Sequence, residues 1–190
     1  MAEKNALRSA LVAARARHDD LAGASAAVCR RLAKLPELAA ARVVAGYAAK
    51  PDEVSIDDAL QRLLDAGVVV CLPWVDGPLL GMSAVEDLTA DLAPGWRGLR
   101  EPVVQRRVPL RPSALDVVLA PGVGFDAAGR RLGFGGGHFD RLLARLRRGA
   151  VVVGIALDEQ IVEQIPTEPH DRNVDVLVTP TRTLRPQSPD

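Results

Sequence analysis

The sequence predicts an α/β protein of three layers (α/β/α), in which helices cover both faces of a mostly parallel sheet. Two observations support this prediction. Short apolar runs alternate along the chain with segments of helical periodicity, as in strand–helix–strand units. Several runs, such as Val68–Leu72 and Val151–Leu157, are apolar throughout rather than at every second position. Strands of that kind are buried on both faces, which is typical of parallel sheets.

Helical periodicity begins near the N-terminus. Residues 3 to about 34 are expected to form a helix broken near Gly23, and Lys4 and Arg8, four positions apart, share one of its faces. The other expected elements are, in chain order, a strand over Val43–Ala48, a helix capped by Ser55 and ended by Gly67, a strand over Val68–Leu72, extended pieces near Leu79–Ser83 and Val103, a strand over Val117–Leu119, a helix over Phe139–Leu146, a strand over Val151–Ala156, a helix over Asp158–Gln164 and a strand over Val174–Val178.

Length and composition indicate the domain organisation and argue against some classes of partner. The 190 residues are expected to form one domain over residues 1–180 and a flexible tail over residues 181–190. The 24 basic and 24 acidic side chains balance, which argues against a nucleic acid or an anionic membrane as a partner held by bulk charge. Cys29 and Cys71 form no Cys-x-x-Cys pair, and no apolar leader is visible, so we expect free thiols and a cytoplasmic location. We also expect a monomer.

One segment contains more residues suited to ligand binding than the rest of the chain. The strand Val117–Leu119 leads through a polar turn to Arg130 and Arg131, and then to four glycines between positions 133 and 137. Glycines let the backbone approach a ligand closely, and free N–H groups before a helix attract phosphate. The segment matches neither the Walker pattern nor the dinucleotide fingerprint. On composition alone, a plain surface turn is the alternative.

The segment Pro121–Arg141 resembles the signature of the 5-formyltetrahydrofolate cyclo-ligase family, and differs from it only at His138 and Phe139, where the family has tyrosines. Other matches are collinear and extend over residues 4–178. They are Lys4 and Arg8 in the first helix, Glu53 after the first strand, Gly98–Pro102, Ile165–Pro166, Asp171 and Val174–Asp175.

The resemblance implies a fold shared with sugar-phosphate isomerases and coenzyme A transferases. It implies an enzyme that uses ATP and Mg²⁺ to close 5-formyltetrahydrofolate to 5,10-methenyltetrahydrofolate, with release of ADP and phosphate. The catalytic residues it implies are Arg131 and Asp140. The ATP-binding residues it implies are Lys4, Asn5, Ala6, Leu7, Arg8, Arg131, Leu132, Gly133, Phe134, Gly135, Gly136, Gly137, His138 and Phe139. The folate-binding residues it implies are Ala48, Glu53, Trp96, Phe134 and His138.

The metal ligands implied are Asp140 and Asp171, with Asp175 as an alternative to the second. A carboxylate in the first turn of a phosphate-binding helix repels phosphate unless a cation lies between them, and Mg²⁺ prefers carboxylate and phosphate oxygens. Without the resemblance, Asp140 is a helix-dipole partner and Asp171 a turn residue.

Other structural alternatives remain open at this point. Lys4 and Arg8 also fit a solvated helix face, Glu53 a loop position and Trp96 a packing position. Two rival functions also remain: a relative that binds nucleotide without cyclo-ligase activity, and a non-catalytic sensor of sugar phosphates. His138 supports the first rival, since it stands where the family has a tyrosine.

Overall fold

The computed structural model describes residues 2–166 and 172–186. Its centre is an eight-stranded sheet in the order β13-β12-β10-β7-β1-β2-β3-β6. The strands of this sheet are β1 (Val43–Ala45), β2 (Val69–Asp76), β3 (Leu79–Val85), β6 (Val108–Leu110), β7 (Val117–Pro121), β10 (Val151–Ile155), β12 (Val176–Val178) and β13 (Thr183–Leu184). The helices are α1 (Ala2–Arg15), α2 (Leu21–Leu32), α3 (Pro36–Ala39), α4 (Asp57–Asp65) and α5 (His138–Leu143).

The middle of the sheet is parallel, as the fully apolar strands predict. β1 pairs in parallel with β2 and β7, and β10 pairs in parallel with β7 and β12. Antiparallel strands extend it at both edges, β3 and β6 on one side and β13 on the other. The predicted mostly parallel sheet is confirmed.

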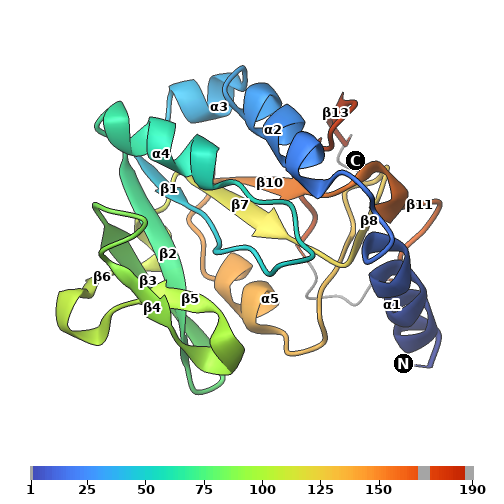
Figure 1. Cartoon of the computed structure of the whole chain (residues 1–190), viewed down its shortest axis with the longest axis horizontal. Coiled ribbons are helices and arrows are strands. Elements are labelled where there is room, and N and C mark those ends of the chain that lie inside the picture. Colours follow the sequence, from blue (N-terminus) through green and yellow to red (C-terminus); the bar gives the residue numbers. More distant parts are fainter. Residues whose placement is uncertain (1, 167–171, 187–190) are drawn as a thin grey trace.

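Helices cover both faces of the sheet, so the three-layer prediction is also confirmed. Helices α2, α3 and α4 lie over one face and α5 over the other (Figure 1). One core cluster joins the α2–α4 layer to the sheet and includes the fully buried Leu32 and Leu60. A second cluster lies on the opposite face and includes Leu142 and Leu143 of α5.

Helix α1 packs away from the main layers, against a small sheet in the order β11-β8-β9. These strands are β8 (Gly124–Asp126), β9 (Arg131–Leu132) and β11 (Ile161–Val162). Leu11 of α1 is buried with Val123, Leu132 and Ile165. A Cβ at Gly124 would lie 2.5 Å from Leu11 Cδ1, so the glycine lets the Leu11 side chain pack directly on this strand.

Several local predictions need correction. The first helix breaks at residues 16–20 and not at Gly23, because the Asp20 side chain accepts the Gly23 N–H and starts a new helix. Ser55 lies one residue before the N-cap of α4, where its hydroxyl accepts the Asp57 N–H. Residues 158–160 form only a 3₁₀ turn, after which β11 begins.

The predicted tail is described up to Pro186, and Thr183–Leu184 within it pairs with β12. Cys29 and Cys71 are free and buried, as expected, and burial raises the pKa of Cys71 to about 12. Over the described part of the chain, we find no helix with the length and apolar character needed to cross a membrane.

Candidate active site

The glycine loop after β9 has a backbone that other residues adopt only with strain. Gly135 has φ +97° and Gly137, the N-cap of α5, has φ +64°. The backbone N–H groups of residues 134–137 donate to no described residue. These N–H groups are therefore available to an anionic ligand. Because α5 has only six residues, the loop amides matter more here than a long helix dipole.

Two arginines from different helices hold the loop by its carbonyl groups. Arg8 of α1 donates from Nε to the Gly133 carbonyl at 2.8 Å. Arg141 of α5 donates to the Gly136 carbonyl at 2.6 Å and to the Pro78 carbonyl at 2.7 Å. The predicted proximity of the N-terminal helix and the glycine loop is thus present, and Arg8 makes the contact.

Arg131 lies beneath the loop, with a side chain only 3% exposed. Its Nη1 donates to the Pro121 carbonyl at 3.1 Å, and its Nη2 donates to Asp140 Oδ1. The side chain of Asp140 is 30% exposed. The two residues predicted as catalytic therefore contact each other, and Asp140 is the more accessible of the two.

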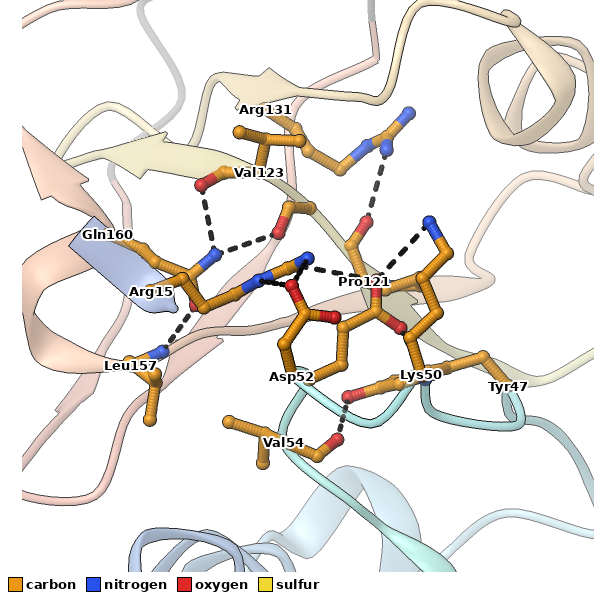
Figure 2. A network of polar contacts seen from close by, with 12 residues as sticks. Arg15, Tyr47, Lys50, Asp52, Val54, Pro121, Val123, Arg131, Leu157 and Gln160 are labelled. Atoms are coloured by element: carbon orange, nitrogen blue, oxygen red, sulfur yellow. Dashed lines mark hydrogen bonds and ion pairs between the residues drawn. The ribbon is translucent and has the colours of Figure 1, made fainter. Parts of the chain in front are cut away.

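A second cluster surrounds Glu53, which is 8% exposed. Glu53 Oε2 accepts the Lys50 backbone N–H at 3.0 Å, and Oε1 accepts from Arg15 Nη1 at 3.3 Å. Arg15 also donates twice to Asp52, at 2.5 and 3.1 Å (Figure 2). A carboxylate has about four acceptor positions, so each oxygen of Glu53 can still accept one donor of a ligand.

Neighbouring groups line the small cavity beside Glu53. Burial, with a smaller contribution from the Glu53 charge, raises the pKa of Tyr47 well above its usual value. The Tyr47 hydroxyl therefore stays protonated and donates to the Val54 carbonyl at 2.7 Å (Figure 2). On the opposite side, the Gln160 amide donates to the Gly122 and Val123 carbonyls at 2.9 Å each and holds the turn after β7.

Phe134 connects the glycine loop to the Glu53 cluster. The Lys50 ammonium lies 3.6 Å from the centroid of the Phe134 ring, and the Arg15 guanidinium carbon lies 5.3 Å from it. Both cations also contact Glu53, with Lys50 Nζ 3.9 Å from Oε1. The structure therefore places the candidate phosphate loop and the candidate folate carboxylate next to each other.

An aromatic pair forms another wall beside the loop. Trp96 and His138 are in edge contact, with ring centroids 5.9 Å apart. His138 follows the last glycine directly, and its Nδ1 is buried without a hydrogen bond to the described residues. Trp96 is 42% exposed, so it is not an ordinary core residue.

The remaining predicted residues take several places. Asn5 accepts from Arg8 Nη1 at 2.6 Å. Leu7 and Leu132 pack in the α1 cluster, so only their backbones are left to meet a ligand. Lys4 lies one turn before Arg8 on α1, and Ala6 is exposed on the same helix. Ala48 is half-buried after β1. Phe139 is half-buried, and the centroid of its ring lies 5.7 Å from the Arg131 guanidinium carbon.

Of the two candidates for the second metal ligand, the structure describes Asp175. Asp171 lies outside the described residues. The side chain of Asp175 accepts the Val152 N–H at 2.7 Å, near the amino end of β10. The chain leaves β7 toward the glycine loop at Pro121, which pairs with Ile155 at the carboxyl end of β10. Asp175 therefore lies at the opposite end of β10 from that turn. Within the described residues, no group of three or more His, Cys, Asp or Glu side chains is placed to hold a metal. One accessible carboxylate beside a phosphate loop nevertheless suits Mg²⁺, which uses one or two carboxylates with phosphate oxygens.

Sequence reasoning missed Arg15, Lys50 and Arg141. A signal for Arg15 was present, since Lys4, Arg8, Leu11 and Arg15 follow i, i+4, i+7 and i+11 and share one helix face. A signal for Arg141 was also present, since it is the last residue of the segment that resembles the family signature. Lys50 has no such signal, because its contacts depend on how distant loops meet.

The fold and the site define a class of α/β protein in which a glycine loop, a candidate anion-binding site, lies next to a buried carboxylate. Comparison with known proteins makes this class specific. The model of the 5-formyltetrahydrofolate cyclo-ligase family matches residues 1–180. This chain therefore belongs to the 5-formyltetrahydrofolate cyclo-ligase family, as predicted, and with it to the ligases.

Individual relatives agree. The chain is 32% identical to the 5-formyltetrahydrofolate cyclo-ligase of Escherichia coli (strain K12), over 80% of this chain and 85% of that protein. It is 30% identical to that of Mycolicibacterium smegmatis, over 75% and 76% of the two chains. The NMR structure of Aquifex aeolicus 5,10-methenyltetrahydrofolate synthetase superposes with a TM-score of 0.85 at 32% identity, over 98% of this chain and 94% of the other.

Proposed function

We propose that this chain catalyses the ATP-dependent cyclisation of 5-formyltetrahydrofolate to 5,10-methenyltetrahydrofolate, with release of ADP and phosphate. The observation that supports this most is the position of Phe134. It extends from the glycine loop onto Lys50 and Arg15, which hold Glu53. A nucleotide at the loop and a pterin at Glu53 are therefore neighbours, as a direct transfer between them requires.

The reaction needs positioning more than a covalent nucleophile. The formyl oxygen attacks the γ-phosphorus of ATP and ADP leaves, which gives a phosphorylated imine. The 10-nitrogen of the folate then attacks the formyl carbon and loses its proton, and phosphate departs with the former formyl oxygen. Both steps move negative charge, which fixed N–H donors and cations stabilise without reorganising.

Each residue has a part in this proposal. The loop amides and Arg8 bind the triphosphate, and Glu53 accepts hydrogen bonds from the pterin amino group and adjacent N–H. Trp96 and His138 wall the folate. Arg131 holds Asp140 in place and supplies positive charge beneath the loop. Asp140 would hold Mg²⁺, which would supply positive charge close to the transferred phosphoryl group.

Three further points are proposals on the same basis. The chain acts as a monomer, it works in the cytoplasm, and residues 1–180 form its single domain. The central eight-stranded sheet, which the two larger core clusters share, supports the last point. Light scattering tests the first, cell fractionation the second and limited proteolysis the third.

The test of the function is the near-ultraviolet absorbance of the methenyl product after protein, Mg²⁺, ATP and 5-formyltetrahydrofolate are mixed. Growth of that band supports the proposal. ATP binding without the band selects a relative that lacks the activity, for which the His138 substitution is the motivating observation. Binding of sugar phosphates in place of ATP selects the sensor. His138→Tyr, in the same assay, shows how much the substitution alters turnover.

A further inference from the structure

Arg97 has a backbone conformation that its residue type disfavours. It lies in the turn between β4 (Leu92–Pro94) and β5 (Arg100–Pro102), with φ +53° and ψ +32°. Among the described residues, it is the only one other than glycine with a positive φ. Arg97 and Gly98 are consecutive positive-φ residues closed by a 3.1 Å hydrogen bond from Leu99 N–H to the Trp96 carbonyl. Such hairpin turns favour Asn, Asp or Gly in the place of Arg97.

The turn directs the Arg97 side chain onto Trp96. The guanidinium carbon lies 4.5 Å from the Trp96 ring. Arg97 is exposed and makes no hydrogen bond or ion pair to any described residue. A strained residue that breaks a local preference is a candidate for function, because function is a common reason for a fold to retain strain.

The neighbouring arginines differ from Arg97, because each has a carboxylate close to its guanidinium. Arg100 pairs with Asp57 at 2.7 Å and Arg106 pairs with Asp91 at 2.9 Å. Arg107 lies 4.0 Å from Glu101. Among these four arginines, only Arg97 has no described carboxylate as a partner. Its guanidinium instead lies over the Trp96 ring.

Trp96 places Arg97 at the rim of the active site. Its ring contacts His138, the residue after the glycine loop. The proposed substrate carries a glutamate tail with two carboxylates at the end remote from the pterin ring. With the pterin at Glu53 and the formyl group at the loop, the proposed arrangement directs this tail along the Trp96–His138 pair.

We propose that Arg97 binds a glutamate carboxylate of the folate substrate and so selects folates that carry the glutamate tail. This inference rests on the proposed function. A guanidinium binds a carboxylate through two parallel hydrogen bonds, and stacking on Trp96 pre-organises it for that contact. Because the tail is remote from the reacting atoms, the contact lowers KM and leaves kcat nearly unchanged.

The experiment compares two substrates, 5-formyltetrahydrofolate and 5-formyltetrahydropteroate, which lacks the glutamate. Arg97→Gln is expected to lower kcat/KM for the first by about fivefold, as for an exposed charge-assisted contact, and to leave the second unchanged. Arg97→Gly removes the guanidinium but tolerates the positive φ, so it folds at least as well and shows the same selective loss. Arg111→Gln, an exposed arginine without a described partner, is the matched control.

Raised salt should reduce the preference of the wild type for the glutamate substrate and leave Arg97→Gln unaffected. An equal loss on both substrates would show that Arg97 acts only through Trp96 packing, and no loss on either would show that it binds nothing. Each result overturns the inference while turnover stands. A wild type that converts neither substrate overturns the proposed function, and the inference with it.

Discussion

The Arg15 guanidinium reaches the Glu53 carboxylate, with Nη1 3.3 Å from Oε1, and the two side chains are only 4% and 8% exposed. Arg15 is seven residues after Arg8, so both lie on one face of α1. Arg8 contacts the glycine loop and Arg15 contacts Glu53, the carboxylate of the proposed folate site. One helix therefore orients groups in both proposed ligand sites.

Replacing Arg15 by Met should destabilise the fold and weaken folate binding. Removing one partner of a buried ion pair leaves an uncompensated charge, and we expect a loss of about 3 kcal/mol in the free energy of unfolding. Urea denaturation measures this. With Glu53→Gln already present, Arg15→Met should cost clearly less, whereas equal costs in both backgrounds would show that the pair is not coupled. Arg17→Met, at an exposed position of the same segment, is the control.

Replacing Asp140 by Asn should lower turnover by about 100-fold or more, because the developing charge on the phosphoryl group loses its metal site. Asn keeps an oxygen that can accept from Arg131, but the buried guanidinium loses a charged partner. Because Asp140 itself is 30% exposed, the free energy of unfolding should fall by only about 1 to 2 kcal/mol. Excess EDTA should reduce wild-type turnover similarly. Wild-type rates in the variant would remove Asp140 from the mechanism.

Replacing Gly137 by Ala should impair nucleotide use. At φ +64°, a Cβ is strained and would lie 2.7 Å from Arg141 Nη1, one of the groups beside the loop. We expect a stability loss of about 1 kcal/mol and a rise in the KM for ATP of about tenfold. Gly149→Ala is the matched control, since Gly149 has φ +81° with its nearest neighbour atom 3.6 Å away. A similar KM in both variants would contradict the role of the loop.

The contact between Arg185 and Glu37 should make part of the stability depend on pH. Hydrogen bonding from Arg185 lowers the pKa of Glu37 below its ordinary value of 4.5. A lowered folded-state pKa adds stability above pH 4.5, and this stability is lost as the pH falls through the folded value. Arg185 is 52% exposed, so Glu37→Gln should cost only about 0.5 kcal/mol at pH 7.

Urea denaturation at several pH values checks this. The difference between wild type and Glu37→Gln should shrink as the pH falls from 5 to 3. A constant difference over that range would show that the pair does not hold the segment after β13 to α3.

Much of the fold could be predicted because the hydrophobic pattern of the sequence indicates which strands are buried. Runs such as Val68–Leu72 are apolar at every position, and only a sheet covered on both faces satisfies them. The ends of helices and strands were harder to predict. The Asp20 side chain decides where α2 begins, and neither the hydrophobic pattern nor Gly23 shows this. Thr183–Leu184 becomes a strand only because β12 offers an edge.

In the site, the glycine loop and Glu53 could be anticipated from local pattern and family resemblance. The contacts that join them could not. Lys50 meets Phe134 across 84 positions of sequence, and no spacing rule connects residues so far apart. Arg131 illustrates the converse, since its motif position was expected but its burial beneath Asp140 depends on tertiary packing.

Titration calorimetry with ATP, in the presence and absence of Mg²⁺, tests the central claim most directly. The glycine loop, with Arg8 above it and Asp140 beside it, should bind one ATP with heat release that depends on Mg²⁺, and Gly137→Ala should weaken this binding. Folded protein that takes up no ATP in the presence of Mg²⁺ would contradict the account.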